Sequence, residues 1–286
     1  MQIEVKNLGH VYSPGMPFET VALKDINFTI ESGEFVGLIG HTGSGKSTLL
    51  MHLNGLLKPT SGQVLAGGVD VNAKNAESRA ARRKLGLVFQ YPEYQLFEET
   101  VIKDVCFGPK NYGFSEEECL EKAKAALKLV GLDPDEKGEK SPFELSGGEK
   151  RRVAIAGVLA MEPEILILDE PTAGLDPKGH RDILNMVRTI RRERGITIFL
   201  VSHNMDDVAE LADRVLVVDK GSLIMNGDVH SVFSRAEELR AIGLGVPSAS
   251  AMLLRLKEKG LDVRTDIFTA KEAAAEIAAA YKRRWQ

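Results

Sequence analysis

The sequence predicts an α/β fold built on a mainly parallel sheet. Three short apolar runs have the length of buried strands and alternate with segments of helical character: ILILD at 165–169, ITIFLVS at 196–202 and RVLVVD at 214–219. Strands that alternate with helices form βαβ units, whose strands run parallel. A further buried run, FVGLIG at 35–40, ends in glycine and leads into a predicted helix over about 46–57.

The other elements of the first 230 residues follow in chain order. Strands are predicted over 3–12, about 21–39 and 85–90. Ser115, with Glu118 three residues later, predicts the capped start of a helix over 115–131. A second helix should follow LSGG and extend to about residue 160, and VVDKGSLIMNGD should form a hairpin that turns at Lys220-Gly221.

The pattern changes near residue 230, beyond which only helices and loops are predicted. Thr269 and Glu272 have the spacing of a capping box at the start of the final helix. We therefore expect a domain over 1–230 and a C-terminal helical extension over 231–286.

Composition excludes several classes of protein. The chain has 286 residues, 43% of them hydrophobic and 27% charged, which is ordinary for a soluble globular protein. Its net charge of -4 does not favour nucleic-acid binding. Cys106 and Cys119 cannot form a disulfide framework and suit a reducing cytoplasm. The apolar runs fall short of the roughly 20 residues that a spanning helix needs, so any work at a membrane should go through a partner.

The stretch GHTGSGKST matches the phosphate-binding pattern G-x-x-x-x-G-K-[ST], with a strand before it and a helix after it. Its glycines let backbone N–H groups approach phosphate oxygens, and the helix N-terminus adds its positive dipole end. Lys46 should neutralise phosphate charge, and the Ser47 hydroxyl should hold Mg²⁺. The residues predicted to bind nucleotide here are Gly40, His41, Thr42, Gly43, Ser44, Gly45, Lys46, Ser47 and Thr48.

The stretch ILILDEPTAGLD at 165–176 places two carboxylates at the end of a predicted strand, where open α/β sheets bind ligands. Asp169 can hold Mg²⁺ through water. Glu170 can polarise an attacking water as a general base. The alternative is a solvated acidic turn, which the phosphate loop at 40–48 makes less attractive.

A second candidate phosphate cradle lies in LSGGEKRRVAIAG at 145–157. Ser146, Gly147 and Gly148 precede a predicted helix whose N-terminus can face a phosphate. One nucleotide does not need two cradles in one chain, so the second should serve a nucleotide held by another copy. This predicts a dimer with ATP at its interface.

These motifs, together with GLD at 174–176 and VSH at 201–203, resemble those of ATP-binding cassette ATPases in the family's order, over residues 3 to 230. The resemblance implies a P-loop NTPase cassette with a mainly parallel core sheet and an antiparallel β subdomain. It also implies a helical subdomain over about 91–160, the C-terminal helical extension, and ATP hydrolysis as the activity.

The resemblance also assigns roles to single residues. Tyr12 would stack on adenine, and a plain core or surface tyrosine is the less favoured alternative. Gln90 would contact Mg²⁺ and the attacking water, and His203 would hold the γ-phosphate and Glu170 in position. Asp176 would help to join the two active sites of the dimer.

One position departs from the family pattern. Glu149 stands directly after LSGG, where glutamine is usual. A carboxylate beside the partner's nucleotide can weaken that composite site or be tolerated in solvent, and we expect hydrolysis to survive.

Three further stretches resemble the ATPase subunits of energy-coupling factor transporters, which import vitamins and transition metals: 11–23, 89–111 and HNMDDVAELADRV at 203–215. The last is similar to the second ATPase of the usual pair. The resemblance implies a second ATPase, identical or paralogous, and a transmembrane coupling protein at the cytoplasmic face of the membrane. Substrate-binding membrane subunits would be indirect partners. The ATPase of another importer, for amino acids or metal ions, or of an exporter is the alternative.

Two segments keep two interpretations each. The stretch Tyr91–Val101 can dock the coupling protein through Tyr94, Leu96 and Phe97, with Glu93, Glu98 and Glu99 for basic residues on it, or it can pack within its subdomain. The extension over 231–286 can add dimer contacts, or its alanine-rich last helix can be a solvated cap.

Overall fold

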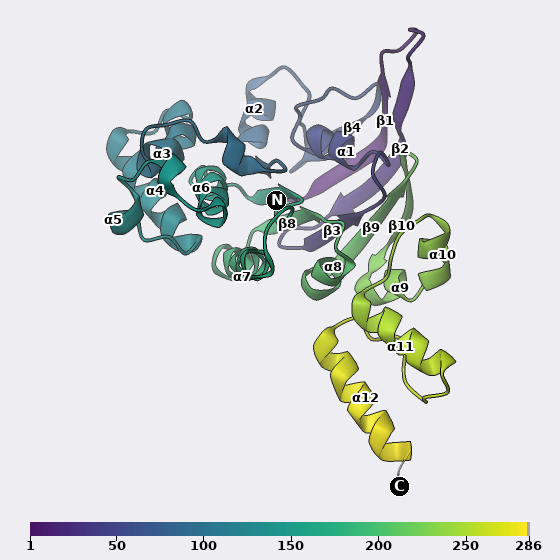
Figure 1. The fold of residues 1–286 in the computed structure, drawn as a ribbon. Coiled ribbons are helices and arrows are strands. Elements are labelled where there is room, and N and C mark those ends of the chain that lie inside the picture. Colours follow the sequence, from purple (N-terminus) through teal and green to yellow (C-terminus); the bar gives the residue numbers. More distant parts are fainter. Residues whose placement is uncertain (285–286) are drawn as a thin grey trace.

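A six-stranded sheet forms the centre of the computed structural model, which describes residues 1–284 (Figure 1). Its order is β10-β9-β3-β8-β7-β6, and among the strand pairs of this sheet in the described residues only β9–β10 is antiparallel. The predicted α/β fold with a mainly parallel sheet is thus confirmed. Its strands are β3 (Phe35–Ile39), β6 (Leu85–Val88), β7 (Ile165–Asp169), β8 (Thr197–Val201), β9 (Arg214–Asp219) and β10 (Ser222–Asp228).

Helices cover both faces of this sheet, which explains why the parallel strands β3, β6, β7 and β8 are largely apolar. In β7, Ile165 and Ile167 belong to the same hydrophobic cluster as helix α1 (Lys46–Leu53). The alternate residues Leu166 and Leu168 belong to a second cluster with helix α7 (Pro177–Arg194). The two-residue period of the strand therefore sends successive side chains to opposite layers. Helix α8 (Met205–Leu211) lies beside α7 below the sheet (Figure 1).

A second, antiparallel sheet has the order β2-β1-β4-β5. Its strands are β1 (Ile3–Tyr12), β2 (Thr20–Ile30), β4 (Ser61–Ala66) and β5 (Val69–Asp70), and helix α2 (Ala76–Arg83) follows them. The predicted segment over about 21–39 is thus two strands in two different sheets. The β9–β10 hairpin turns at Lys220-Gly221, as predicted, with both residues at positive φ.

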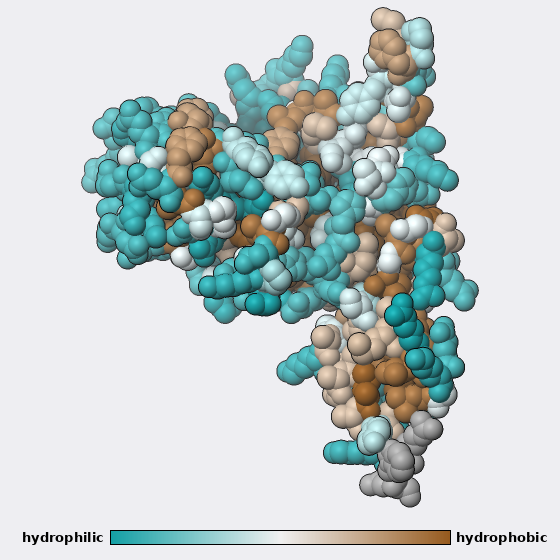
Figure 2. Space-filling model, viewed as in Figure 1, coloured by the Kyte–Doolittle hydropathy of each residue, from teal (hydrophilic) through white to brown (hydrophobic). Residues whose placement is uncertain are grey.

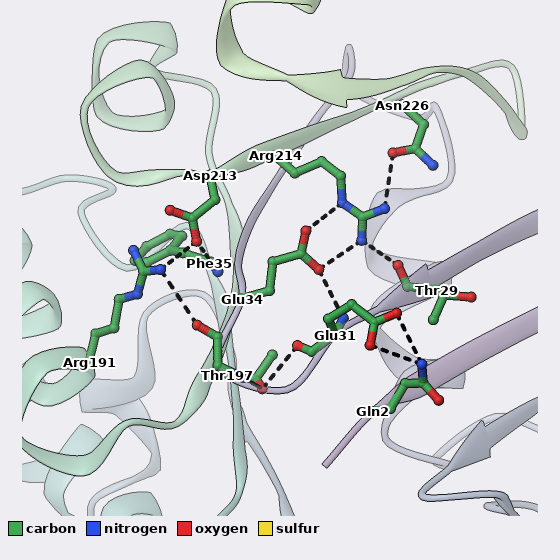
Figure 3. A network of polar contacts seen from close by, with 11 residues as sticks. Gln2, Thr29, Glu31, Glu34, Phe35, Arg191, Thr197, Asp213, Arg214 and Asn226 are labelled. Carbon is green, nitrogen blue, oxygen red and sulfur yellow. Dashed lines mark hydrogen bonds and ion pairs between the residues drawn. The ribbon is translucent and has the colours of Figure 1, made fainter.

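A polar network joins the two sheets near the amino ends of the parallel strands (Figure 3). Arg214 of β9 pairs with Glu34 through Nε and Oε1 at 2.6 Å and donates to the Thr29 carbonyl of β2. Beside it, Arg191 of α7 pairs with Asp213, which accepts from the backbone N–H of Phe35 at 2.9 Å. This network lies at the opposite end of the sheet from the phosphate loop.

The helices between residues 92 and 159 lie together on one side of the molecule (Figure 1). In α4 the Ser115 hydroxyl accepts from the Glu118 N–H at 3.2 Å, and the Glu118 carboxylate accepts from the Ser115 N–H at 2.8 Å, so the predicted capping box is present. The elements are η1 (Pro92–Gln95), α3 (Val101–Asn111), α4 (Glu116–Leu129), α5 (Pro134–Lys137), η2 (Pro142–Glu144) and α6 (Gly147–Leu159).

The C-terminal helices differ in what they pack against. Helices α9 (Val229–Phe233) and α10 (Ala236–Ala241) share a hydrophobic cluster with β9. Helices α11 (Ser248–Glu258) and α12 (Ala270–Arg284) form a cluster of their own. The boundary near 230 stays a prediction, and the last two residues of the predicted extension lie outside the described residues. Among residues 1–284, no helix has the length and apolar character needed to cross a membrane.

Candidate active site

The phosphate loop connects the carboxyl end of β3 to the first turn of α1. Two of its glycines are required by close packing. A Cβ on Gly40 would lie 2.4 Å from the Val218 carbonyl oxygen, and one on Gly45 would lie 2.7 Å from the Ala22 carbonyl oxygen. Gly45 also has φ of 108°, which a side chain would strain. The loop can therefore wrap closely only with glycine at these positions.

Lys46 is buried at the base of this loop. Its Nζ donates to the carbonyl oxygens of Gly40 at 2.7 Å and His41 at 2.9 Å. Burial lowers the pKa of Lys46, and the nearby carboxylates of Glu170 and Asp169 oppose that shift. The ammonium group is thus held at the helix N-terminus, where a phosphate would complete its ion pairing.

The side chain of His41 is turned toward β9. Its Nε2 lies 2.7 Å from Asp219 Oδ1, and its Nδ1 lies 2.7 Å from the Thr42 carbonyl oxygen. His41 therefore ties the phosphate loop to the end of β9. This leaves its backbone, rather than its ring, to face a nucleotide.

A cleft of about 590 Å³ brings together most of the predicted nucleotide-binding and catalytic residues. Those that line it are Tyr12, Thr42, Gly43, Gly45, Lys46, Ser47, Thr48, Gln90, Glu170 and His203. Gly40, His41 and Ser44 belong to the loop without lining the cleft. Thr20, Val21 and Ala22 of β2 also line it and were not predicted. Their strand pattern carries no sign of a ligand, and only the resemblance of the stretch 11–23 to energy-coupling factor ATPases points to this region.

Glu170 lies directly after β7, between Gln90 and His203. Its Oε1 is 2.8 Å from His203 Nε2, and its Oε2 accepts from Gln90 Nε2 at 3.2 Å. Its backbone is left-handed, with φ of 48°, and its N–H donates to the Val201 carbonyl at 3.0 Å. The predicted catalytic trio therefore meets around one carboxylate, in a backbone conformation that non-glycine residues rarely adopt.

Asp169, the last residue of β7, has a perturbed carboxyl group. Burial raises its pKa to about 6, the neighbouring Glu170 adds to the rise, and Lys46 opposes it. The three residues predicted to hold Mg²⁺, Ser47, Gln90 and Asp169, offer oxygen donors, which that ion prefers. A divalent cation would also favour the charged form of Asp169, so the donor set fits the ion.

Tyr12 stands at the rim of the cleft. Its hydroxyl shares a hydrogen bond with Thr48 Oγ1 at 3.2 Å, and its ring meets the His10 ring edge-on, with centroids 4.5 Å apart. These contacts hold the ring from its hydroxyl and from His10. The arrangement is compatible with stacking on a base.

The second predicted cradle does not line this cleft. Ser146 is the N-cap of α6, and Gly147 and Gly148 form its first turn. The Ser146 hydroxyl donates to Glu149 Oε2 at 2.7 Å, and Lys137 Nζ lies 2.9 Å from the other Glu149 oxygen. These hydrogen bonds, from the Ser146 side chain first, lower the pKa of Glu149 to about 2. The role of this cradle in a site shared with another copy therefore stays a prediction.

The loop after Glu170 leads to α7, whose N-cap is Asp176. Asp176 Oδ1 accepts from the Gly179 N–H at 2.8 Å, and the residue does not line the cleft. One turn into α7, His180 Nε2 lies 2.8 Å from Asp207 Oδ2 of α8. This contact between α7 and α8 was not predicted, because the two residues lie far apart in the sequence.

Residues 23–173 match the family model described as ABC transporter. The chain is 55% identical to the energy-coupling factor transporter ATP-binding protein EcfA2 of Clostridium perfringens over 280 residues, which cover 97% of this chain and 98% of that protein. The protein of the same name from Bacillus licheniformis is 50% identical over 285 residues, with 99% and 98% covered.

The chain is also similar to solved structures of ABC transporter cassettes. The structure of cbiO1 from Clostridium perfringens, part of the ABC transporter complex cbiONQ, is 41% identical with a TM-score of 0.73, over 84% of this chain and 93% of that chain. The dimeric cassette MJ0796, in a post-hydrolysis state bound to ADP and Pi, is 32% identical with a TM-score of 0.70, over 79% and 98%. The chain therefore belongs to the ABC transporter family, and within it to the energy-coupling factor transporter ATP-binding proteins.

Proposed function

We propose that this chain hydrolyses ATP to power the import of a vitamin or a transition-metal ion through an energy-coupling factor transporter. It would work as one half of an ATP-sandwich dimer beneath a transmembrane coupling protein. The observation that carries the proposal is Glu170, held between Gln90 and His203 at the mouth of the phosphate-loop cleft.

The phosphate loop and Lys46 would bind the triphosphate, and Tyr12 would stack on the base. Ser47, Gln90 and Asp169 would hold Mg²⁺, which when bound neutralises phosphate charge. Glu170 then accepts a proton from the attacking water. His203 and Gln90 bond to its two oxygens and fix the direction in which the carboxylate points, as a general base requires.

The second nucleotide-binding element supports a dimer. Ser146, Gly147 and Gly148 lie at a helix N-terminus outside the cleft, so they would complete the site of another ATPase, identical or paralogous. Asp176, at the start of α7, would join the two sites. The similar cassette MJ0796 is a dimer in its solved structures, which supports this arrangement.

A groove of about 720 Å³ beside Gln90 supports docking of the coupling protein. It lies between α2, β6 and the end of α3, and Phe89, directly before Gln90, lines it. Arg79, Arg82 and Arg83 also line it, so acidic groups on the partner would suit it. An occupant of this groove would touch Phe89, directly before Gln90, which is predicted to contact Mg²⁺ and the attacking water.

Within the segment Tyr91–Val101, the structure changes which residues are available. Tyr94 and Phe97 are exposed, but Leu96 is buried in the core of the helical subdomain and is not a docking residue. The carboxylate of Glu93 accepts a hydrogen bond from Arg151 within the subdomain, and Glu99 pairs with Lys103 at 2.8 Å on the surface. Within this segment the docking contact would therefore rest on the three exposed aromatic residues, Tyr91, Tyr94 and Phe97, and on Glu98.

The C-terminal extension would add dimer contacts. Figure 2 shows a hydrophobic surface over α11 and α12. Met252 of α11 is among the exposed large hydrophobic residues. The Ser248 N–H and hydroxyl donate to Asp206 of α8 at 2.7 and 2.6 Å, which fixes the extension to the helix that follows His203. A second copy packing on α11 and α12 would thus be linked through α8 to the segment that carries His203.

The ATPase of another importer or of an exporter would share the same cleft. The names of the relatives favour the energy-coupling factor assignment, and the partners would place the chain at the cytoplasmic face of the membrane. Affinity purification from solubilised membranes separates the alternatives. We expect a second ATPase and one coupling membrane protein, whereas two permeases would favour another class of importer.

The activity is tested with Glu170→Gln, which keeps the shape of the side chain and removes the base. We expect kcat to fall by about 100-fold or more, with ATP still bound and a closed dimer accumulating on size-exclusion chromatography. The control is Glu164→Gln at the other end of β7, where the carboxylate pairs with Lys84. Wild-type turnover by Glu170→Gln would contradict the assigned role.

A further inference from the structure

One arginine of α6 is among the most deeply buried large side chains of the described residues. Arg151 is 1% exposed and follows Gly148 by three residues. Its guanidinium group forms a bidentate pair with Glu93, with Nε donating to Oε2 at 2.9 Å and Nη2 to Oε1 at 2.6 Å. A buried charge is tolerated only where it is paired and hydrogen-bonded, so both partners depend on this contact.

The third nitrogen of Arg151 bonds to a different part of the chain. Nη1 donates to the carbonyl oxygens of Pro171 at 3.0 Å and Ala173 at 2.7 Å. Both carbonyls belong to the loop directly after Glu170. A single planar group therefore connects helix α6, which follows LSGG, with the segment after Gln90 and with the loop after Glu170.

We infer that Arg151 and Glu93 are positioning residues that hold the loop after Glu170 in register with the segment after Gln90. The inference rests on the proposed function, because it assigns to that site a route from the coupling protein to the base. A protein docked on the segment Tyr91–Val101 would move Glu93. Through Arg151 that movement would reach the loop that carries Glu170.

The backbone of Glu170 supports this role. A left-handed conformation at a non-glycine residue persists only where its surroundings enforce it. The two carbonyls held by Arg151 lie one and three residues beyond Glu170, so Arg151 contributes to that enforcement. Lysine could not replace it, because an ammonium group lacks the fork geometry that reaches four acceptors at once.

The test uses the full chain in the complex with which it purifies from detergent-solubilised membranes. Glu93→Gln keeps the size of the side chain and removes the charge. We expect kcat to fall about tenfold with KM for ATP within about twofold of wild type, because the loop at 40–48 and Tyr12 are untouched. Arg151→Lys should show the same division between kcat and KM.

The matched control is Glu34→Gln. Glu34 also forms a bidentate pair with an arginine, and its side chain is 16% exposed against 15% for Glu93. Its partner Arg214, in the network of Figure 3, lies at the amino ends of the parallel strands, whereas Glu170 follows the carboxyl end of β7. Glu34→Gln should therefore lower the melting temperature and leave kcat and KM unchanged.

Two results would overturn the inference. In the first, Glu93→Gln turns over ATP at the wild-type rate. In the second, Glu34→Gln lowers kcat as much as Glu93→Gln does, which would make the pair merely structural. Failure of the proposed function is distinct, because it would appear as a wild-type complex without ATPase activity.

Discussion

His52 shows how the fold sets the charge of a single residue. It is fully buried, its Nδ1 donates to the Leu57 carbonyl at 3.0 Å, and its ring lies 4.7 Å from that of His10. Burial lowers the pKa of His52 to about 4, and His10 adds to the shift. Because the folded pKa is below the ordinary value of 6.5, the unfolded chain takes the proton first.

The contribution of His52 to the free energy of unfolding is therefore fully present above about pH 6.5, where His52 is neutral in both states. It is lost as the pH falls toward 4. We expect His52→Gln, which keeps a donor for Leu57, to remove this dependence. The melting temperature of wild type should fall by about 4 °C more than that of the variant between pH 7 and pH 5. Parallel curves for the two proteins, recorded by differential scanning calorimetry, would show that His52 is not the titrating group.

Residue chemistry in the motifs could be predicted from the sequence, whereas pairing across the chain could not. The spacing of the phosphate loop and of the pair Asp169-Glu170 limits these residues to few roles, and the cleft brings Glu170 to Gln90 and His203. Glu93 was predicted to face a partner, yet it bonds to Arg151, which is 58 positions away. No local pattern announces such a contact, because only the packing of the helical subdomain brings the two residues together.

At the scale of elements, the start of α6 carries a capping box next to a predicted phosphate cradle. Glu149 accepts from the Ser146 N–H at 3.0 Å and from its hydroxyl at 2.7 Å, and Lys137 balances its charge. The contact therefore restrains the hydroxyl that the partner's ATP would need. This favours the interpretation that Glu149 weakens the composite ATP site without abolishing hydrolysis.

We expect Glu149→Gln to lower KM for ATP by about two- to fivefold, because a negative charge is removed from beside an anion site at a helix N-terminus. Steady-state ATPase assays of the complex measure this. The matched control is Glu118→Gln in α4, which alters the same kind of capping box on a helix without a predicted phosphate cradle. A change in KM equal in both variants would attribute the effect to helix capping alone.

Elements with capping signals and strong periodicity were predictable, and those whose signals conflict were not. Helix α4 begins at its capping box as expected. Helix α3 was not predicted, because Pro109 lies inside it and its N-cap, Thr100, follows a loop rich in carboxylates. Leu96 was grouped with its aromatic neighbours as a docking residue in one of the two interpretations of its segment, yet it is buried, because in a short irregular segment no period distinguishes the buried side from the exposed side.

At the scale of the whole molecule, the order of the motifs along the chain was enough to predict the cassette, because the phosphate loop, the pair Asp169-Glu170 and VSH lie at the carboxyl ends of strands β3, β7 and β8 of one sheet. What joins the cassette to other proteins lies outside those motifs. Phe97 is 58% exposed and touches Phe107 edge-on, with ring centroids 4.9 Å apart. Exposed aromatic side chains of this kind are frequent anchors at protein interfaces.

Phe97→Ala should therefore weaken assembly with the coupling membrane protein by about 30-fold, as loss of an interface anchor does, while leaving the melting temperature near that of wild type. Co-purification from solubilised membranes and ATP-driven uptake measure the effect. Phe18→Ala provides the control, because Phe18 is also exposed but lies in the loop between β1 and β2, far along the chain from this segment. Normal assembly and uptake in Phe97→Ala would favour the other interpretation, in which the segment Tyr91–Val101 packs only within its own subdomain. The two outcomes differ in what happens to water at the Phe97 ring. Docking removes water from the exposed part of the ring when the partner binds. Packing within the subdomain buries only the part of the ring that already contacts Phe107.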